Sequence, residues 1–195
     1  HFVYKATSAT LHTAGTIYTK KKFSTGLVGY TKGTTVINNC WSSVSIISSV
    51  SGDGSHGGFV GYTEENLSNT TLTDCLTDGS ITGENTNSCG GLIGWNYDKA
   101  TLTNCVFRPT GITLANSDNA TFSRGSNVTV TNCYFSEELP GAFGQGTAIG
   151  NMSDEALLAE LGSGWTESER KVAPIVTKAS DIINPVFHGV IINAT

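Results

Sequence analysis

The chain is built from short hydrophobic runs that alternate with glycine and small polar residues and return in the same order along the sequence. A hydrophobic pair bounded by glycines and followed by an aromatic residue occurs three times, and a divergent fourth copy follows, at 26–30, 58–62, 91–95 and 122–125. Each copy leads to a second run in which a cysteine lies three residues after an aliphatic residue, at Cys40, Cys75, Cys105 and Cys133. Residues after Cys40 alternate between hydrophobic or small and outward polar positions, which is typical of a half-buried strand. The pattern therefore predicts two short strands in each copy.

Repetition at intervals of about 30 residues indicates a repeat protein, in which one unit buries its apolar face only against a stacked neighbour. We predict an all-β solenoid of about four coils over residues 1–139. The alternating strand within the partial first coil would serve as a template on which the next coil stacks. The coils are expected near 10–25, and then at 26–57, 58–90, 91–121 and 122–139.

The four cysteines at the shared repeat position are predicted to form one buried column. In-register residues of stacked strands lie about 5 Å apart, and small thiols suit such an interior position. We expect thiols rather than disulfides, with Cys89 outside the register. The residue before each cysteine breaks the alternation, at Asn39, Asp74, Asn104 and Asn132. Because Asn and Asp tolerate left-handed backbone conformations, we interpret these residues as a structural ladder along a corner of the coil.

The repeat stops near residue 140, and residues 140–180 are predicted to form a C-terminal cap. A serine followed by acidic residues and by leucines at helical spacing predicts a short helix at 153–162. We expect this helix, Trp165 and a strand at 172–176 to cover the open sheet edge of the last coil, which would otherwise invite aggregation. A final alternating strand in 181–195 belongs to the cap or begins a following β domain.

Composition and charge narrow the functional class. Only 14% of the residues are charged and 23 are glycine, which is typical of extracellular β-rich repeats. The formal net charge is −5, so nucleic acid is not expected as a partner, because phosphate binding needs a basic face. No apolar run approaches the roughly 18 residues that a membrane span needs. Since the chain begins at His1 inside a repeat-like stretch, we expect a piece of a longer, secreted polypeptide.

Candidate catalytic and metal-binding groups are scattered along the sequence. An enzyme on this scaffold would need clustered carboxylates for acid–base work on a polysaccharide, whereas the acids here lie in separate turns. The four histidines are far apart in the sequence, at His1, His12, His56 and His188. The sequence contains no HExxH or CxxC pattern of the kind that binds zinc. We therefore predict no catalytic residue, no metal and no cofactor.

Aromatic residues at repeat positions are the best candidates for a binding surface. Outward rings offer flat apolar faces to a sugar or a protein partner, and the longest loop adds two acids. The candidate binding residues are Trp41, Tyr62, Glu64, Glu65, Trp95 and Tyr134. The alternative is that these rings pack against neighbouring loops.

Outward threonines raise a third possibility, which is binding to ice. Thr73, Thr103 and Thr131 take the same repeat position and would form a row. However, Asn38 interrupts the row, and each strand offers only one reliably outward threonine. These two features argue against an ice-binding face.

The Gly-Leu-Val-Gly and Gly-Phe-Val-Gly phrases, with Asn-Cys phrases about a dozen residues later, resemble the GLUG-type repeats of bacterial cell-surface proteins. The resemblance covers residues 10 to about 135 and implies a right-handed, parallel β-helix-like solenoid displayed outside the cell. It brings no catalytic residues with it. We therefore expect a non-catalytic, adhesin-like module that binds a host or matrix glycan or protein. The alternative is a carbohydrate-binding or accessory domain of a larger polysaccharide-active enzyme.

Overall fold

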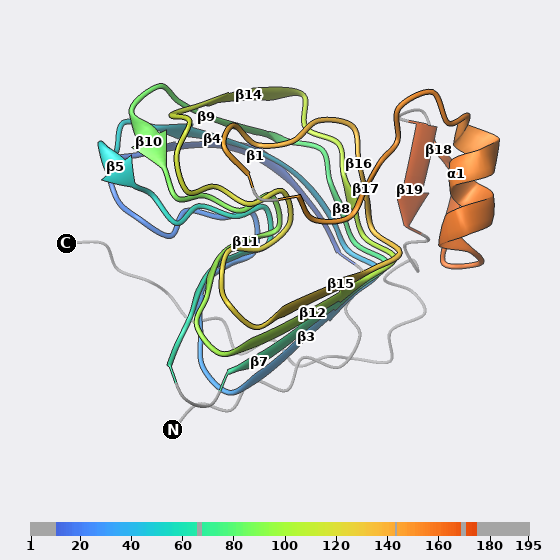
Figure 1. Cartoon of the computed structure of the whole chain (residues 1–195), viewed down its shortest axis with the longest axis horizontal. Helices are drawn as coiled ribbons and strands as arrows, with labels where there is room; N and C mark the ends of the chain where they lie inside the picture. The colour runs from blue at the N-terminus through green and yellow to red at the C-terminus, as the bar shows by residue number, and fades with distance from the viewer. Residues whose placement is uncertain (1–10, 66–67, 143, 169–170, 175–195) are drawn as a thin grey trace.

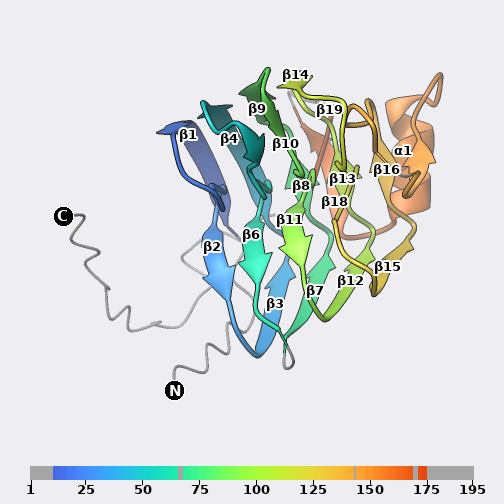
Figure 2. The ribbon, with the colours of Figure 1, turned by 60° about the vertical axis from the view of Figure 1, so that its left-hand side comes forward.

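The computed structural model describes residues 11–65, 68–142, 144–168 and 171–174, which form a parallel β-solenoid of about four turns with a short helix near its C-terminal end (Figure 1). This arrangement confirms the all-β solenoid predicted from the repeats. Equivalent strands of successive turns lie side by side, so the turns stack along one axis (Figure 2). The strand expected in 181–195 lies outside the described residues, as do the last residues of the strand expected at 172–176.

The first sheet has eight strands in the order β14-β9-β4-β8-β13-β16-β17, with β1 also paired to β4. All of its pairs are parallel, as stacking of coils requires. Strand β1 pairs with β4 along its whole length, so it serves as the template predicted for the first full coil. The strands are β1 (His12–Thr19), β4 (Trp41–Ser48), β8 (Leu76–Thr77), β9 (Ser80–Gly83), β13 (Val106–Phe107), β14 (Gly111–Leu114), β16 (Tyr134–Phe135) and β17 (Thr147–Ala148).

Two further parallel sheets complete the wall of the solenoid. The second sheet, in the order β15-β12-β7-β3, contains β3 (Thr34–Asn38), β7 (Asn69–Thr73), β12 (Lys99–Thr103) and β15 (Val128–Thr131). The third sheet, in the order β11-β6-β2, contains β2 (Val28–Thr31), β6 (Val60–Thr63) and β11 (Ile93–Asn96). A small pair, β5 (Gly52–Asp53) and β10 (Thr86–Asn87), lies between the first and third sheets along the chain.

The interior is filled by in-register columns of side chains, as the period-two pattern predicted. Ile37, Leu72 and Leu102 are aligned on adjacent strands of the second sheet and are buried. The four repeat cysteines lie in the next column, are all buried, and form no disulfide within the described part of the chain. Backbone hydrogen bonds from Leu76 N to Cys40 O and from Val106 N to Cys75 O fix the register of this column. The four cysteines thus form one buried, in-register column.

Left-handed residues form two ladders, of which the sequence predicted one. The corner residues that the sequence predicted all have a φ of 51° or 52°; they are Asn39, Asp74, Asn104 and Asn132. A second in-register set of positive φ, between 43° and 67°, lies at Phe23, Ser55, Ser88 and Asp118. This second ladder turns the chain into the third sheet, and its members share a backbone conformation but not a residue type.

The glycine phrases are explained by close backbone approach rather than by a positive φ. A Cβ atom on Gly61 would lie 2.6 Å from the carbonyl oxygens of both Gly29 and Phe23. A Cβ atom on Gly94 would overlap the carbonyl oxygen of Ser55 and lie 2.6 Å from that of Gly61. Real Cβ atoms essentially never come this close to backbone oxygens, so only glycine fits where each coil turns tightly into the third sheet.

The C-terminal helix forms where the sequence predicted it but packs elsewhere. Helix α1 (Asp154–Leu161) is capped by the Ser153 side chain, which accepts from Ala156 N, and it ends at Gly162. Together with the antiparallel pair β18 (Trp165–Ser168) and β19 (Lys171–Pro174), it buries an apolar cluster against the outer face of the first sheet. The prediction that the helix covers the open edge of the last coil is wrong. Figure 1 shows the cap beside the solenoid wall instead.

The segment after β16 closes the end of the solenoid. Leu139 is buried in the main core beneath the last turn. The side-chain amide of Gln145 accepts from the backbone N–H groups of Phe122 and Ser123 and donates to the Ser123 carbonyl. This amide satisfies the backbone groups that a further strand of the third sheet would otherwise bond. The open edge that we expected the helix to cover is therefore covered by this loop.

Candidate ligand-binding face

The outer surface of the third sheet carries a column of aromatic rings, formed by Tyr30, Tyr62 and Trp95. These residues occupy equivalent positions on β2, β6 and β11. The Tyr30 and Tyr62 rings are stacked, with centroids 5.5 Å apart and an interplanar angle of 15°. The ring of Phe23, from the second left-handed ladder, contacts Tyr62 at 4.9 Å. The column runs parallel to the axis along which the turns stack.

Arg124 ends the aromatic column at the last turn. The pairing of Ile93 with Ser123 places Gly125 where a fourth ring would stand. The guanidinium of Arg124 instead lies 4.6 Å from the centre of the Trp95 ring. Its side chain is 10% exposed, donates to the carbonyl oxygen of Ser88, and pairs with Asp118. The divergent fourth repeat thus replaces stacking of a ring by a cation–π contact.

Glu64 and Lys32 lie beside the Tyr30 end of the column. Lys32 Nζ and Glu64 Oε2 form an ion pair at 3.0 Å, with side chains 53% and 31% exposed. Hydrogen bonds from Lys32 and from the Tyr30 hydroxyl lower the pKa of Glu64. Desolvation and the hydrogen bond with Glu64 raise the pKa of Tyr30. Near neutral pH Glu64 is therefore a carboxylate and Tyr30 a neutral phenol.

Glu65 and Tyr97 lie beside the Trp95 end. The hydrogen bond with Glu65 is the main cause that raises the pKa of Tyr97. The Tyr97 side chain is 41% exposed, and its ring meets the Trp95 ring at 78° with centroids 6.4 Å apart. We call this surface the aromatic face; its members are Tyr30, Lys32, Tyr62, Glu64, Glu65, Trp95 and Tyr97.

Four of the six predicted binding residues therefore lie on one surface, namely Tyr62, Glu64, Glu65 and Trp95. Tyr97 was not among the predicted residues. It could have been found from the sequence, because it follows Trp95 by two positions and alternation places such residues on the same side of a strand.

The other two predicted binding residues lie elsewhere. Tyr134 is only 6% exposed, beneath the C-terminal cap, and its hydroxyl donates to Asn132 Oδ1 at 2.8 Å. Trp41 is half-buried, stacks on His12 with centroids 4.2 Å apart, and packs against the same apolar cluster. The prediction of outward aromatic rings is wrong for both, because the cap returns to cover this part of the first sheet.

The corner ladder also contacts the cap. The indole N–H of Trp165 donates to Asp74 Oδ1 at 3.2 Å, and Asn132 Nδ2 donates to the carbonyl oxygen of Glu160 at 2.7 Å. These contacts agree with the structural role that the sequence predicted for the ladder.

A buried polar column runs along the second ladder and brings His56 next to Cys89. His56 Nδ1 accepts from Ser24 N, so Nε2 carries the hydrogen and donates to Ser48 Oγ. Burial lowers the pKa of His56 to about 4, because the cost of desolvating the charged ring exceeds the opposite effect of the nearby Asp53 carboxylate. Burial raises the pKa of the Cys89 thiol to about 12. Near neutral pH His56 is therefore a neutral, weak base whose Nδ1 is already hydrogen-bonded, and Cys89 stays a thiol. We assign the pair to the core.

Burial of His56 predicts a loss of stability at acidic pH. Because its pKa falls from 6.5 to about 4 on folding, the unfolded chain binds the proton first as the pH decreases. Stability is retained above about pH 6.5, declines toward pH 4 and levels off below, with a total loss of about 3 kcal/mol. Urea unfolding between pH 7 and pH 4 should show a shallower decline for His56→Gln than for the wild type. Equal declines would contradict a buried, neutral His56.

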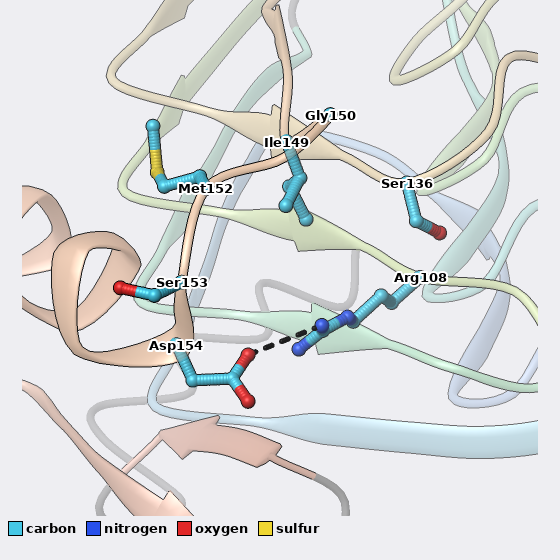
Figure 3. A pocket seen from close by; sticks show the side chains of 7 residues that line it. All are labelled: Arg108, Ser136, Ile149, Gly150, Met152, Ser153 and Asp154. Carbon is cyan, nitrogen blue, oxygen red and sulfur yellow. Dashed lines mark hydrogen bonds and ion pairs between the residues drawn. The ribbon is translucent and has the colours of Figure 1, made fainter.

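A cavity of about 480 Å³ lies where the solenoid meets the start of α1 (Figure 3). Arg108, which follows β13, and Asp154 of α1 point toward one another and form an ion pair at 3.3 Å. Ser136, Ile149 and Met152 form part of the remaining wall. Since Asp154 balances the charge of Arg108, we assign this pair to holding the cap against the solenoid. Within the described residues, no three His, Cys, Asp or Glu side chains gather closely enough to hold a metal ion.

The second sheet presents more threonines to the outside than the sequence suggested. The burial of Leu72 and Leu102 leaves both neighbouring threonines of each strand on the outer side, so two columns form rather than one. The outward threonines are Thr71, Thr73, Thr101, Thr103, Thr129 and Thr131. The expectation of one outward threonine per strand is therefore wrong, although Val36 and Asn38 still interrupt both columns in the first full turn.

Comparison of the chain with protein-family models, with curated proteins and with solved structures finds no match. Among the described residues, no helix has the length and apolar character needed to cross a bilayer.

Proposed function

We propose that the chain is a non-catalytic binding module that holds an extracellular glycan or protein against the aromatic face. The observation that carries this proposal is the gathering of three aromatic rings on the third sheet with one further ring, two carboxylates and one ammonium just beyond the ends of its strands. Tyrosine and tryptophan supply large, rigid contact area at a low cost in conformational entropy, and they are enriched where binding energy concentrates.

The exposed groups of the aromatic face have the chemistry that such a ligand needs. Tyr30 and Tyr97 are 52% and 41% exposed, so their rings still have apolar area to bury. The carboxylates of Glu64 and Glu65 accept hydrogen bonds from hydroxyl or amide groups, and Lys32 donates them. Apolar area combined with a few oriented polar groups is the usual composition of a specific binding site.

The scaffold and the repeats support a surface-displayed, adhesin-like setting. A stacked solenoid is stiff because each turn is paired with its neighbours along three sheets. The repeat phrases resemble those of GLUG-type bacterial cell-surface proteins. The second candidate function is that of a carbohydrate-binding accessory domain in a larger polysaccharide-active enzyme. The carboxylates beside the rings favour the accessory domain as much as the adhesin-like module. Both candidate functions would use the aromatic face.

A binding screen with one matched pair of variants tests the proposal. The purified chain is applied to a glycan array and to immobilised extracellular matrix proteins. For the best ligand, Tyr97→Ala is expected to raise Kd roughly tenfold, because it removes an exposed ring of the aromatic face. Tyr18→Ala is the control, since Tyr18 is 78% exposed but lies on β1 of the first sheet.

The screen also separates binding from catalysis. A reducing-sugar assay on each bound polysaccharide is expected to show no cleavage. Release of sugar ends that is abolished by a single acid substitution would overturn the non-catalytic proposal. A loss of affinity in Tyr18→Ala equal to that in Tyr97→Ala would place binding away from the aromatic face.

A further inference from the structure

The rings of the aromatic column are not equally available to a ligand. Tyr62 is stacked on Tyr30 and is also contacted by Phe23, so its ring lies between two neighbours. Trp95 is covered by the guanidinium of Arg124 and by the edge of Tyr97. Both rings are partly buried and have neighbours on their faces, so they offer less free face than an uncovered ring. A ligand that stacks face to face on an aromatic ring needs a different place.

Tyr30 supplies an open ring face because it stands at the end of the column. Among the described strands, β2 lies at the edge of the third sheet, so no ring of the described residues follows Tyr30 in the pairing order of that sheet. Its ring is nearly parallel to that of Tyr62, and the face turned away from Tyr62 has no described ring over it. The 52% exposure of Tyr30 is the largest in the column.

Polar groups of opposite charge border this open face. The Glu64 carboxylate pairs with the Lys32 ammonium at 3.0 Å, and the backbone N–H of Glu64 donates to the carbonyl oxygen of Thr31, the residue after Tyr30, so both charged groups lie beside the ring. The carboxylate accepts hydrogen bonds and the ammonium donates them, and each keeps unused capacity. Because their charges balance, the rim favours a neutral ligand over a charged one.

We propose that Tyr30 is the stacking platform for one neutral pyranose ring, whose hydroxyl groups are bound by Glu64 and Lys32. A pyranose has an apolar face of C–H groups that packs on an aromatic ring and a rim of hydroxyl groups that both donate and accept. The site at Tyr30 is complementary to both parts. This inference rests on the proposed function and narrows its ligand to a neutral sugar held at one end of the aromatic face.

Titration of neutral hexose oligosaccharides selected from the array tests this assignment. Tyr30→Ala is expected to weaken binding of the best oligosaccharide at least about tenfold, because the platform is lost. Tyr30→Phe keeps the ring and removes the hydroxyl, so its Kd should stay within about threefold of the wild-type value. Glu64→Gln keeps the shape but weakens acceptance from the sugar, and should weaken binding without changing the circular dichroism spectrum.

The outcomes distinguish this inference from the proposed function. If the chain binds a neutral oligosaccharide and Tyr30→Ala binds it as tightly as the wild type, the platform assignment is overturned and the binding function stands. If the chain binds a matrix protein and no neutral sugar, the pyranose assignment is likewise overturned. If the wild type binds nothing in either screen, both proposals fail together. Tyr18→Ala again serves as the exposed-tyrosine control.

Discussion

Replacing Gly94 by alanine is expected to prevent stable folding of the solenoid. The added Cβ would overlap the carbonyl oxygen of Ser55 and lie 2.6 Å from that of Gly61, both on the preceding turn. Neither oxygen belongs to a flexible side chain, so relief requires separation of two stacked turns. We expect a loss of more than about 4 kcal/mol, a large part of the 5–15 kcal/mol typical of whole proteins.

Urea unfolding followed by circular dichroism measures this effect, and a second glycine provides the control. A Cβ on Gly111 would come no closer than 3.8 Å to Ser80 Cβ, which is ordinary contact, and Gly111 lies at the start of β14. Gly111→Ala should therefore change the free energy of unfolding by no more than about 0.5 kcal/mol. If Gly94→Ala unfolds at the same urea concentration as the wild type, the close-approach explanation of the glycine phrases fails.

Replacing Cys75 by aspartate is expected to be similarly severe. Cys75 is 0% exposed, and its Sγ lies 3.2 Å from the carbonyl oxygen of Thr73, within a column whose neighbours on both sides are thiols. A carboxylate there would have no cation beside it, so burial would either force protonation or unfold the turn. We expect Cys75→Asp to cost more than about 4 kcal/mol at pH 7.

The pH dependence of this variant separates charge from shape. Cys75→Asn introduces nearly the same shape without ionisation and should cost less at pH 7. Because burial raises the pKa of an aspartate, the unfolded state gains stability by ionising above about pH 4, and the gap between the Asp and Asn variants should narrow as the pH falls toward that value. A gap that is the same at pH 7 and pH 4 would show that packing, rather than charge, causes the loss.

Local patterns in the sequence were sufficient for the elements that neighbouring residues determine. The shared position of the cysteines predicted a column, and the Asn or Asp before each one predicted a left-handed corner. The second ladder was missed because Phe23, Ser55, Ser88 and Asp118 share only a backbone conformation. No single residue type marks this second corner in the sequence. The glycines that follow it do not mark it either, because they permit close backbone approach and do not have a positive φ.

Contacts between distant parts of the chain account for the predictions that failed. Alternation correctly placed Tyr134 on the outer side of its strand, but it contained no information on the cap that returns to bury it. The helix was predicted from its capping residues, whereas its docking surface depends on Leu76 and Val106, which lie much earlier in the sequence.

The aromatic face was predicted in part because its rings repeat in register. Tyr62 and Trp95 take the same place in successive copies, and stacking of the turns brings them together. The role of Arg124 could not be predicted, because the fourth copy lacks the glycine-bounded hydrophobic pair of the others. Only the folded chain places the Arg124 guanidinium over the Trp95 ring. The difference between the fourth copy and the others thus closes the Trp95 end of the aromatic column, whereas the Tyr30 end stays open.

The central claim is that ligand binds on the aromatic face, and nuclear magnetic resonance of the isotopically labelled chain tests it most directly. The glycan or protein that binds best in the screen is titrated while backbone amide and indole N–H shifts are followed. We predict that shift changes concentrate at Tyr30, Lys32, Glu64, Trp95 and Tyr97, including the indole N–H of Trp95. Changes confined to the outward threonines of the second sheet, or to the cavity beside α1, with the Trp95 indole unmoved, would contradict this account.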